Sequence, residues 1–122
     1  MADPLHIDKD LVAASATPLV LGILAGGESY GYAILKQVNE LSGGRMAWTD
    51  GMLYPLLHRL ERQGHVKSSW GTSDAGRRRK HYSITPAGRD ALAERHRQWS
   101  VVAEALDSIW RGIASPATEF AS

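Results

Sequence analysis

Hydrophobic positions in the first half of the chain repeat at intervals of three and four residues, the spacing of a helix that buries one face. Glycine pairs and turn residues interrupt the pattern, so it predicts short helices. The first spans about Lys9–Ala25 and ends at Gly26-Gly27. Pro18 lies inside this stretch, and the sequence leaves two possibilities open: the helix begins at Pro18, or it bends there.

The next two helices have both start and stop signals. Ser29 is the expected N-cap of the second helix, which ends at Gly43-Gly44. Thr49 is the expected N-cap of the third, which runs to Arg62 and is followed by Gly64. The apolar face of the third helix consists of leucines: Leu53, Leu56, Leu57 and Leu60.

After Gly64 the period changes to two, which is typical of strands. Val66, Ser68 and Trp70 alternate with more polar neighbours, and the same alternation returns from Lys80 to Thr85. The residues between them, 71–76, are turn formers. This pattern predicts a β-hairpin with a basic edge.

The last helix begins at Thr85-Pro86, a capping residue followed by proline at the first helical position. Extending to about Arg111, it would be roughly 39 Å long, more than a body of about 80 residues can cover. Its apolar residues alternate at spacings of three and four, as in a coiled coil, with an interruption at Arg95. We therefore expect a homodimer that buries this seam, formed by Leu92, Trp99, Val102, Leu106, Ile109 and Ile113.

The formal net charge of +1 hides a separation of charge along the chain. Residues 1–50 hold three Lys or Arg and six Asp or Glu, residues 51–99 hold ten and four, and residues 100–122 hold one and three. Positive charge is thus confined to the middle of the chain, which indicates an anionic partner for that part.

The chain has 122 residues and no cysteine, which favours one domain without disulfides or cysteine-based zinc sites. Its longest apolar stretch, Leu19–Ala25, is shorter than the roughly 20 residues of a membrane span. We expect a cytoplasmic protein with no membrane partner. No nucleophile elbow, phosphate-binding loop or dinucleotide motif occurs, so we expect neither enzyme activity nor a cofactor.

Three short helices followed by a hairpin are the order of a winged helix-turn-helix, a mainly α fold with a β-hairpin (α+β). We expect the DNA-binding domain over residues 1–85, a dimerisation helix over 86–113 and a flexible tail over 114–122. In such a fold the third helix enters the DNA major groove, and the hairpin, or wing, contacts the backbone or minor groove beside it.

Two groups of residues are candidates for contacting DNA. The N-terminal amides of the third helix and its Thr49 hydroxyl suit phosphate oxygens, while Tyr54 offers a hydroxyl or a ring. Four consecutive cations in the wing can follow a line of phosphates. Both groups are also compatible with ordinary solvated faces. The candidates are Thr49, Asp50, Gly51, Tyr54, Pro55, His58 and Arg59 in the helix, and Arg77, Arg78, Arg79 and Lys80 in the wing.

Three motifs resemble those of the PadR family of bacterial transcriptional regulators: Ser29-Tyr30-Gly31-Tyr32, the segment LYPLLHRLERQG at 53–64, and the segment from Gly76 to Gly88. The similarity covers about residues 10–112. It implies a homodimeric repressor, associated with the bacterial nucleoid, that binds a palindromic operator on double-stranded DNA. It also adds Tyr30 to the candidates for DNA contact.

Ser69-Trp70-Gly71 and Gln98-Trp99-Ser100 are also similar to the lactococcal multidrug-binding member of this family. This resemblance implies that Trp99 stacks with its dimer mate on a planar aromatic effector that relieves repression. Trp99 could equally pack the seam and bind nothing. By matching positions, the pore would be lined by Leu11, Ala14, Pro18, His96, Trp99 and Ala103.

Two other functions stay open from the sequence. A helical adaptor would use the same seam to hold a protein partner and would not touch DNA. A metal-responsive regulator is the third possibility, although the five histidines form no His-x3-His pair.

Overall fold

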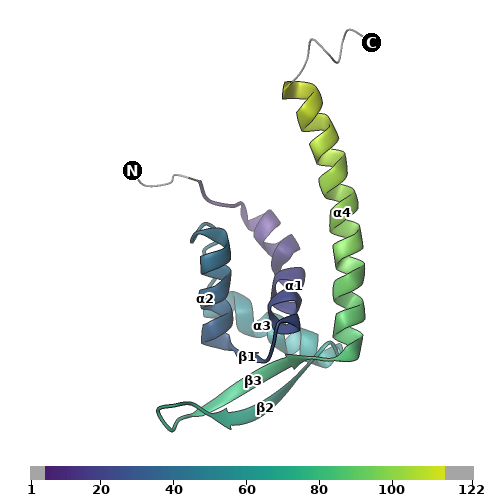
Figure 1. Cartoon of the computed structure of the whole chain (residues 1–122). Coiled ribbons are helices and arrows are strands. Elements are labelled where there is room, and N and C mark those ends of the chain that lie inside the picture. Colours follow the sequence, from purple (N-terminus) through teal and green to yellow (C-terminus); the bar gives the residue numbers. More distant parts are fainter. Residues whose placement is uncertain (1–4, 115–122) are drawn as a thin grey trace. The chain divides into compact units, whose positions relative to one another are not determined.

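The computed structural model describes residues 5–114. Its elements are α1 (Lys9–Ala25), β1 (Ser29–Tyr30), α2 (Gly31–Ser42), α3 (Asp50–Arg62), β2 (Val66–Thr72), β3 (Arg78–Ile84) and α4 (Pro86–Ala114) (Figure 1). The chain divides into two compact units, Met1–Leu92 and Ala93–Ser122. The domain boundaries expected at residues 85 and 113 stay a prediction. From residue 115 onward, the expected tail lies outside the described residues.

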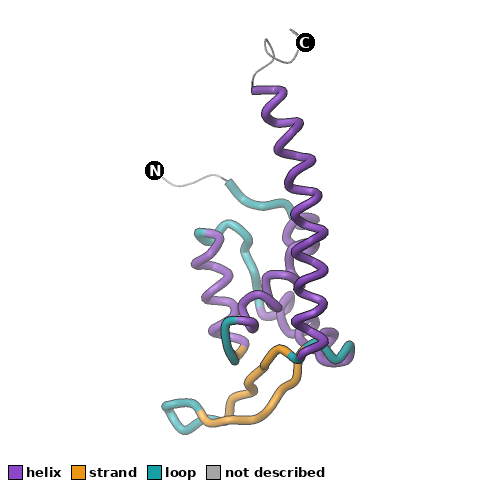
Figure 2. Tube along the Cα trace, turned by 45° about the vertical axis from the view of Figure 1, so that its right-hand side comes forward, coloured by secondary structure: helices purple, strands orange, loops and turns teal. Residues whose placement is uncertain are grey.

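In the first unit, α1–α3 pack together above a small antiparallel sheet with the strand order β1-β3-β2. The mainly α winged-helix fold expected from the sequence is confirmed. The sheet lies at one end of the three helices, and the turn between β2 and β3 projects away from them (Figures 1 and 2). The side chains with the least exposure in this core are Val20, Leu21, Leu24, Ile34, Val38, Leu53, Leu57, Leu60 and Tyr82.

Helix α1 runs without interruption through Pro18. Of the two possibilities left by the sequence, a helix beginning at Pro18 is therefore wrong. Proline lacks the N–H of the usual helical hydrogen bond, but apolar side chains on both sides of it, such as Val12 and Leu21, are buried. Packing on the body thus stabilises the helix on either side of the proline. Gly26 is the C-cap, as expected.

The glycines expected to end α2 and α3 have the left-handed backbone conformation that favours glycine. Gly43, the C-cap of α2, has φ 63°, and Gly64, just beyond α3, has φ 79°. The N–H of His65 donates to the Leu60 carbonyl at 2.9 Å, and that of Gly64 donates to the Glu61 carbonyl at 3.0 Å. This pair of bonds is a Schellman motif, which ends α3 sharply before the wing.

The short strand β1 was not expected from the sequence. Ser29 and Tyr30 pair with Tyr82 and His81 of β3, respectively. The expectation that Ser29 caps α2 is therefore wrong: the N-cap is Tyr30, in extended conformation and without a side-chain capping bond. Pairing with β3 holds Ser29 in a strand, one position before the N-cap. Two residues are too short for strand alternation to be visible in the sequence.

Thr85 joins the end of α3 to the start of α4. Its hydroxyl donates to the Gly64 carbonyl at 2.6 Å and accepts a hydrogen bond from the Gly88 N–H at 3.0 Å, which is the expected N-cap contact. The Thr85 N–H donates to the His65 carbonyl at 3.0 Å. Gly88 lies tightly against this turn, since a Cβ atom there would be 2.7 Å from Ile84 Cγ1.

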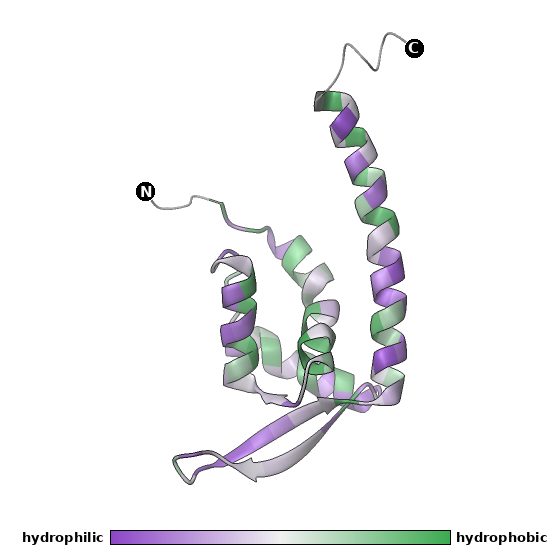
Figure 3. Cartoon of the chain, in the orientation of Figure 1, coloured by the Kyte–Doolittle hydropathy of each residue, from purple (hydrophilic) through white to green (hydrophobic). Residues whose placement is uncertain are grey.

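The second unit, described to residue 114, consists of the remainder of α4. Hydrophobic and hydrophilic residues alternate along it (Figure 3). The seam predicted from the sequence forms continuous helix, and its residues Val102, Leu106, Ile109 and Ile113 are exposed. Among the described residues, no helix has both the length and the apolar character needed to cross a bilayer.

Replacing Gly88 with alanine should destabilise the fold, because its methyl group would overlap Ile84 and the His65 backbone. We expect the free energy of unfolding to fall by about 1–3 kcal/mol, as for an overpacked core. Gly22→Ala is the matched control, since a Cβ atom there meets nothing within 4 Å. It should raise the free energy of unfolding by about 0.5–1 kcal/mol, because Ala is a better helix former. Urea unfolding of both variants measures this, and equal effects would contradict the packing argument.

Candidate nucleic-acid interface

Helix α3 has one buried and one exposed face. All four leucines of the apolar face predicted from the sequence are buried. Thr49 is the N-cap, as expected, but its side chain makes no capping hydrogen bond. Tyr54 and His58 are on the exposed face, one turn apart. The helix therefore presents its N-terminal end and one polar face to solvent, as a DNA-reading helix requires.

A groove of about 600 Å³ is lined by the start of α2, the exposed face of α3 and the wing, residues 66–84. Some of the residues predicted to contact DNA line it together: Tyr30, Tyr54, His58, Arg77, Arg78, Arg79 and Lys80. Others are not among its lining residues: Thr49, Asp50, Gly51, Pro55 and Arg59. Contact with DNA stays a prediction for both groups, but only the first group shares one concave surface.

Tyr54 is fixed in this groove by its packing on α2. A Cβ atom at Gly31 would lie 2.7 Å from Cζ of Tyr54, so only glycine leaves room for the ring. Gly31 is buried, whereas Tyr54 remains 38% exposed. The glycine of the Ser29-Tyr30-Gly31-Tyr32 motif therefore positions a side chain of α3.

Three of the four wing cations lie over aromatic rings. The guanidinium carbon of Arg79 is 3.6 Å from the centroid of the Tyr30 ring, and that of Arg78 is 4.5 Å from the Trp70 ring. Lys80 Nζ is 5.6 Å from the Tyr82 ring. Cation–π contacts of this kind restrict long side chains without neutralising their charge. The wing thus presents ordered positive charge.

Trp70 lines the groove but was not among the residues predicted to contact DNA. It is 61% exposed, and it alternates along β2 with Val66 and Ser68. The strand continues past the helices that cover its first residues, so the same face that buries Val66 leaves Trp70 in solvent (Figure 1). Tyr32, which is 70% exposed, was also missed. The signal was the interleaving of aromatic and basic residues.

Glu61, in the last turn of α3, connects this helix to both strands of the hairpin. Its Oε2 accepts a hydrogen bond from Ser68 Oγ of β2 at 2.5 Å, and its Oε1 is 3.9 Å from Lys80 Nζ of β3. Burial, with the nearby charge of Glu61 and the neighbouring Tyr54, raises the pKa of Tyr82 above its ordinary value. Tyr82 is therefore a neutral core residue beneath the groove at physiological pH.

His81, in β3, makes a second set of contacts in the sheet. His81 Nδ1 is 3.5 Å from Glu28 Oε1, and its ring meets Tyr30 edge-on with the ring centroids 5.8 Å apart. A Cβ atom at Gly71, which pairs with Arg79, would lie 2.9 Å from His81 Cδ2, so the histidine ring fills the space beside this glycine. These contacts hold β1 and the wing together.

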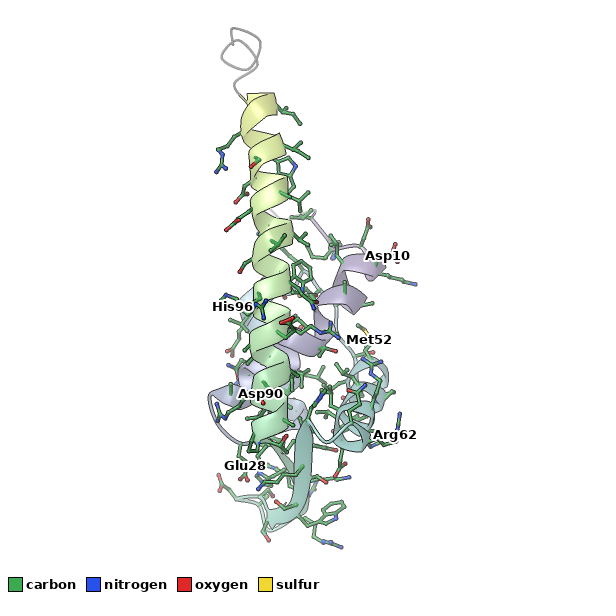
Figure 4. All side chains as sticks on the ribbon, turned by 90° about the vertical axis from the view of Figure 1, so that its right-hand side faces the viewer. Asp10, Glu28, Met52, Arg62, Asp90 and His96 are labelled. Carbon is green, nitrogen blue, oxygen red and sulfur yellow. The ribbon has the colours of Figure 1, made fainter. Side chains whose placement is uncertain are left out.

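Arg59 does not face the groove. Its Nη2 donates to Thr17 Oγ1 of α1 at a long 3.5 Å, so the side chain reaches toward the helical body. Met52 and Arg62, near the two ends of α3, lie along its outer edge in Figure 4. The direction of Arg59 could not be read from α3 alone, because it depends on the packing of α1.

The residues expected to line an effector pore lie on two helices, in different units. Leu11, Ala14 and Pro18 follow one another at helical spacing on α1, and Leu11 is 55% exposed. On α4, His96, Trp99 and Ala103 have the same spacing. Each set thus shares one helix face, while pore formation stays a prediction.

A cluster of three or more His, Cys, Asp or Glu side chains able to hold a metal ion is not found within residues 5–114. The groove chemistry is instead that of cations and aromatic rings, which suits phosphates and bases.

The match to the model of the PadR-like transcriptional regulator family spans residues 20–94. A transcriptional regulator of Mycobacterium tuberculosis is 48% identical over 58 residues, which are 48% of this chain and 53% of that protein. The solved structure of a PadR-like transcriptional regulator from Bacillus cereus has a TM-score of 0.76 at 25% identity, covering 85% of this chain and 99% of that one. A PadR family regulator from Eggerthella lenta has a TM-score of 0.72 at 31% identity, with 83% and 86% covered.

These similarities include the helices, the sheet and the wing that form the groove. They agree with the motifs of the sequence, and they concern transcriptional regulators, not enzymes. The chain belongs to the PadR-like family of transcriptional regulators.

Proposed function

We propose that the protein is a homodimeric repressor that binds a palindromic operator through α3 and the wing and is released by a planar aromatic effector. The groove between these elements carries the proposal. Its lining brings Tyr54 and His58 of α3 together with the four wing cations. Side chains that reach base edges and side chains that follow phosphates are thus on one surface, as recognition of duplex DNA requires.

The wing supplies the sequence-independent part of binding in this proposal. Arg77 and Arg78 are exposed next to the turn between β2 and β3. Guanidinium groups bind phosphate oxygens in a bidentate manner, and each neutralised phosphate releases counterions. The first turn of α3, with Thr49, Asp50 and Gly51, supplies helix N-terminal amides for a further phosphate or base edge.

Replacing Arg77 and Arg78 together with alanine should weaken binding to duplex DNA of any sequence. We expect the slope of log K against log salt concentration to become shallower by about 1.8 per chain, since each phosphate contact contributes about 0.9. Fluorescence anisotropy over a salt series measures it. The control, Lys9→Ala with Arg111→Ala, removes two cations outside the groove and should leave the slope unchanged. Unchanged DNA binding in the wing variant would contradict the proposed role of the wing, whereas no measurable duplex binding by the natural protein would favour the protein-adaptor alternative.

The described part of the second unit suggests how two chains associate. Val102, Ile109 and Ile113 are 48%, 60% and 70% exposed on α4, and Leu106 lies on the same seam. Trp110, which is 56% exposed, widens this apolar stripe, because it lies one helical turn after Leu106 and directly follows Ile109. A continuous exposed stripe of this kind is buried by a second helix with the same pattern, and a second copy of α4 supplies one.

Leu106→Asp should therefore convert the dimer to monomer. A carboxylate in the buried seam has no partner, and we expect the dimer dissociation constant to rise about a hundredfold or more. Multi-angle light scattering over a dilution series measures it. Ser108→Asp introduces the same charge away from the seam and should leave the dimer intact. If the Leu106→Asp variant stays fully dimeric on dilution, the interface lies on another surface.

Two-fold symmetry links the proposed dimer to a palindromic operator. The recognition helices of a symmetric dimer meet half-sites about 34–36 Å apart or a multiple of this. A ligand that changes the angle between the two α4 helices would change that spacing and lower operator affinity. The contacts from Thr85 to Gly64 and His65 support this coupling, because they attach the start of α4 to the end of α3.

Trp99 is the proposed platform for the effector. Titration with acridone, a flat uncharged aromatic, should quench tryptophan emission in the natural protein, because stacked rings exchange excitation energy at contact distance. The Trp99→Ala variant, which keeps Trp48, Trp70 and Trp110, should lose most of this quenching. Equal quenching in the two proteins would contradict an effector site at Trp99 and leave it as a seam residue.

A further inference from the structure

The four basic residues of the wing differ in their surroundings. Arg77 and Arg78 are exposed, and Arg79 is half-buried against Tyr30. Lys80 differs from all three, because its ammonium group is 3.9 Å from a carboxylate oxygen of Glu61; like Arg79 it is half-buried, with 33% of its side chain exposed. The ring of Tyr82 lies beneath the same ammonium group. Of these four residues, all of which the structure describes, only Lys80 forms an ion pair with a carboxylate of α3.

Glu61 is itself held in place. Ser68 Oγ donates to its second oxygen at 2.5 Å, so the carboxylate bridges β2 and β3 from the last turn of α3. An ion pair at this exposure is weak when both side chains must be ordered to form it. Here the hydrogen bond from Ser68 already orders the carboxylate, and the aromatic ring restricts the lysine. Both conditions favour the pair over a solvated Lys80.

We propose that Glu61 is a positioning residue that fixes the wing to the recognition helix and keeps Lys80 from binding phosphate. The inference rests on the proposed DNA contact of the wing and goes beyond it, since it divides the basic run by role. Arg77, Arg78 and Arg79 bind the phosphates, whereas Lys80 pairs with Glu61 and helps to hold the wing against α3. Glu61 thereby limits the affinity for DNA of any sequence, which favours operator over non-specific DNA.

A thermodynamic cycle on Glu61 and Lys80 tests the inference. The proteins are the natural chain, Glu61→Gln, Lys80→Gln and the double variant, with Arg78→Gln as the reference for one lost phosphate contact. The amide introduced by Glu61→Gln keeps an oxygen to accept the Ser68 hydrogen bond, while it removes the charge and replaces the second oxygen with an NH2 group that cannot pair with Lys80. The probe is a mixed-sequence DNA duplex of roughly 30 base pairs, long enough for two half-sites. Fluorescence anisotropy over a sodium chloride series gives the salt slope, and thermal unfolding checks that each variant folds.

Lys80→Gln in the natural background should change the slope by much less than Arg78→Gln, which should make it shallower by about 0.9 per chain. Glu61→Gln should free Lys80, steepen the slope by about 0.9 per chain and strengthen binding. Adding Lys80→Gln to Glu61→Gln should then abolish that gain. Asp90→Asn, an equal change of charge at an exposed site in α4 outside the groove lining, should leave the slope unchanged.

The inference is overturned if Lys80→Gln alone makes the salt slope as much shallower as Arg78→Gln does, because Lys80 would then be an ordinary phosphate contact. It is also overturned if Glu61→Gln and Asp90→Asn have equal effects, because only net charge would matter. These outcomes leave the proposed function standing. If neither the natural protein nor the Arg78→Gln variant shows salt-dependent binding to the duplex, the proposed DNA contact of the wing fails as well.

Discussion

The contacts of Thr85 are the constraint on which the arrangement of the first unit depends. One hydroxyl donates to the carbonyl of Gly64 and accepts from the N–H of Gly88, while the Thr85 N–H reaches the His65 carbonyl. The end of α3, the end of β3 and the start of α4 therefore meet within a few ångströms. Gly64 has the left-handed backbone conformation that favours glycine, and a side chain at position 88 would overlap Ile84. Both requirements explain why these two positions are glycine.

Because α3 ends sharply at this point, the wing begins at once and its register is set by the same turn. Val66 pairs with Ile84 beside the junction, and every later pair of the hairpin follows from that match. Glu61 then ties the helix to the hairpin one turn before the junction. Helix α3 and the wing are thus attached at two places, which fixes the walls of the groove between them relative to each other.

Local signals determine most of what the sequence predicted correctly. The four leucines of α3, the left-handed glycines at 43 and 64, and the Thr85 cap each depend on neighbours in the chain. The sequence did not predict β1, the exposure of Trp70 or the direction of Arg59. Each of these depends on a partner far along the chain: β3 for Ser29, the end of helical cover for Trp70, and Thr17 for Arg59.

The exposed hydrophobic residues fall into two kinds that differ in their charged neighbours. Trp70 in the wing lies beneath Arg78, in a basic part of the chain, so an apolar surface there is adjacent to positive charge. Ile109 and Ile113 in α4 belong to residues 100–122, which hold one basic and three acidic residues. A nucleic acid, with stacked bases inside an anionic backbone, matches the first kind and is repelled by the second. A helix with a similar apolar stripe matches the exposed surface of α4, because such a stripe adds no charge to the interface. Neither exposed surface is needed to complete the core of the first unit, so both are free to serve contacts with other molecules.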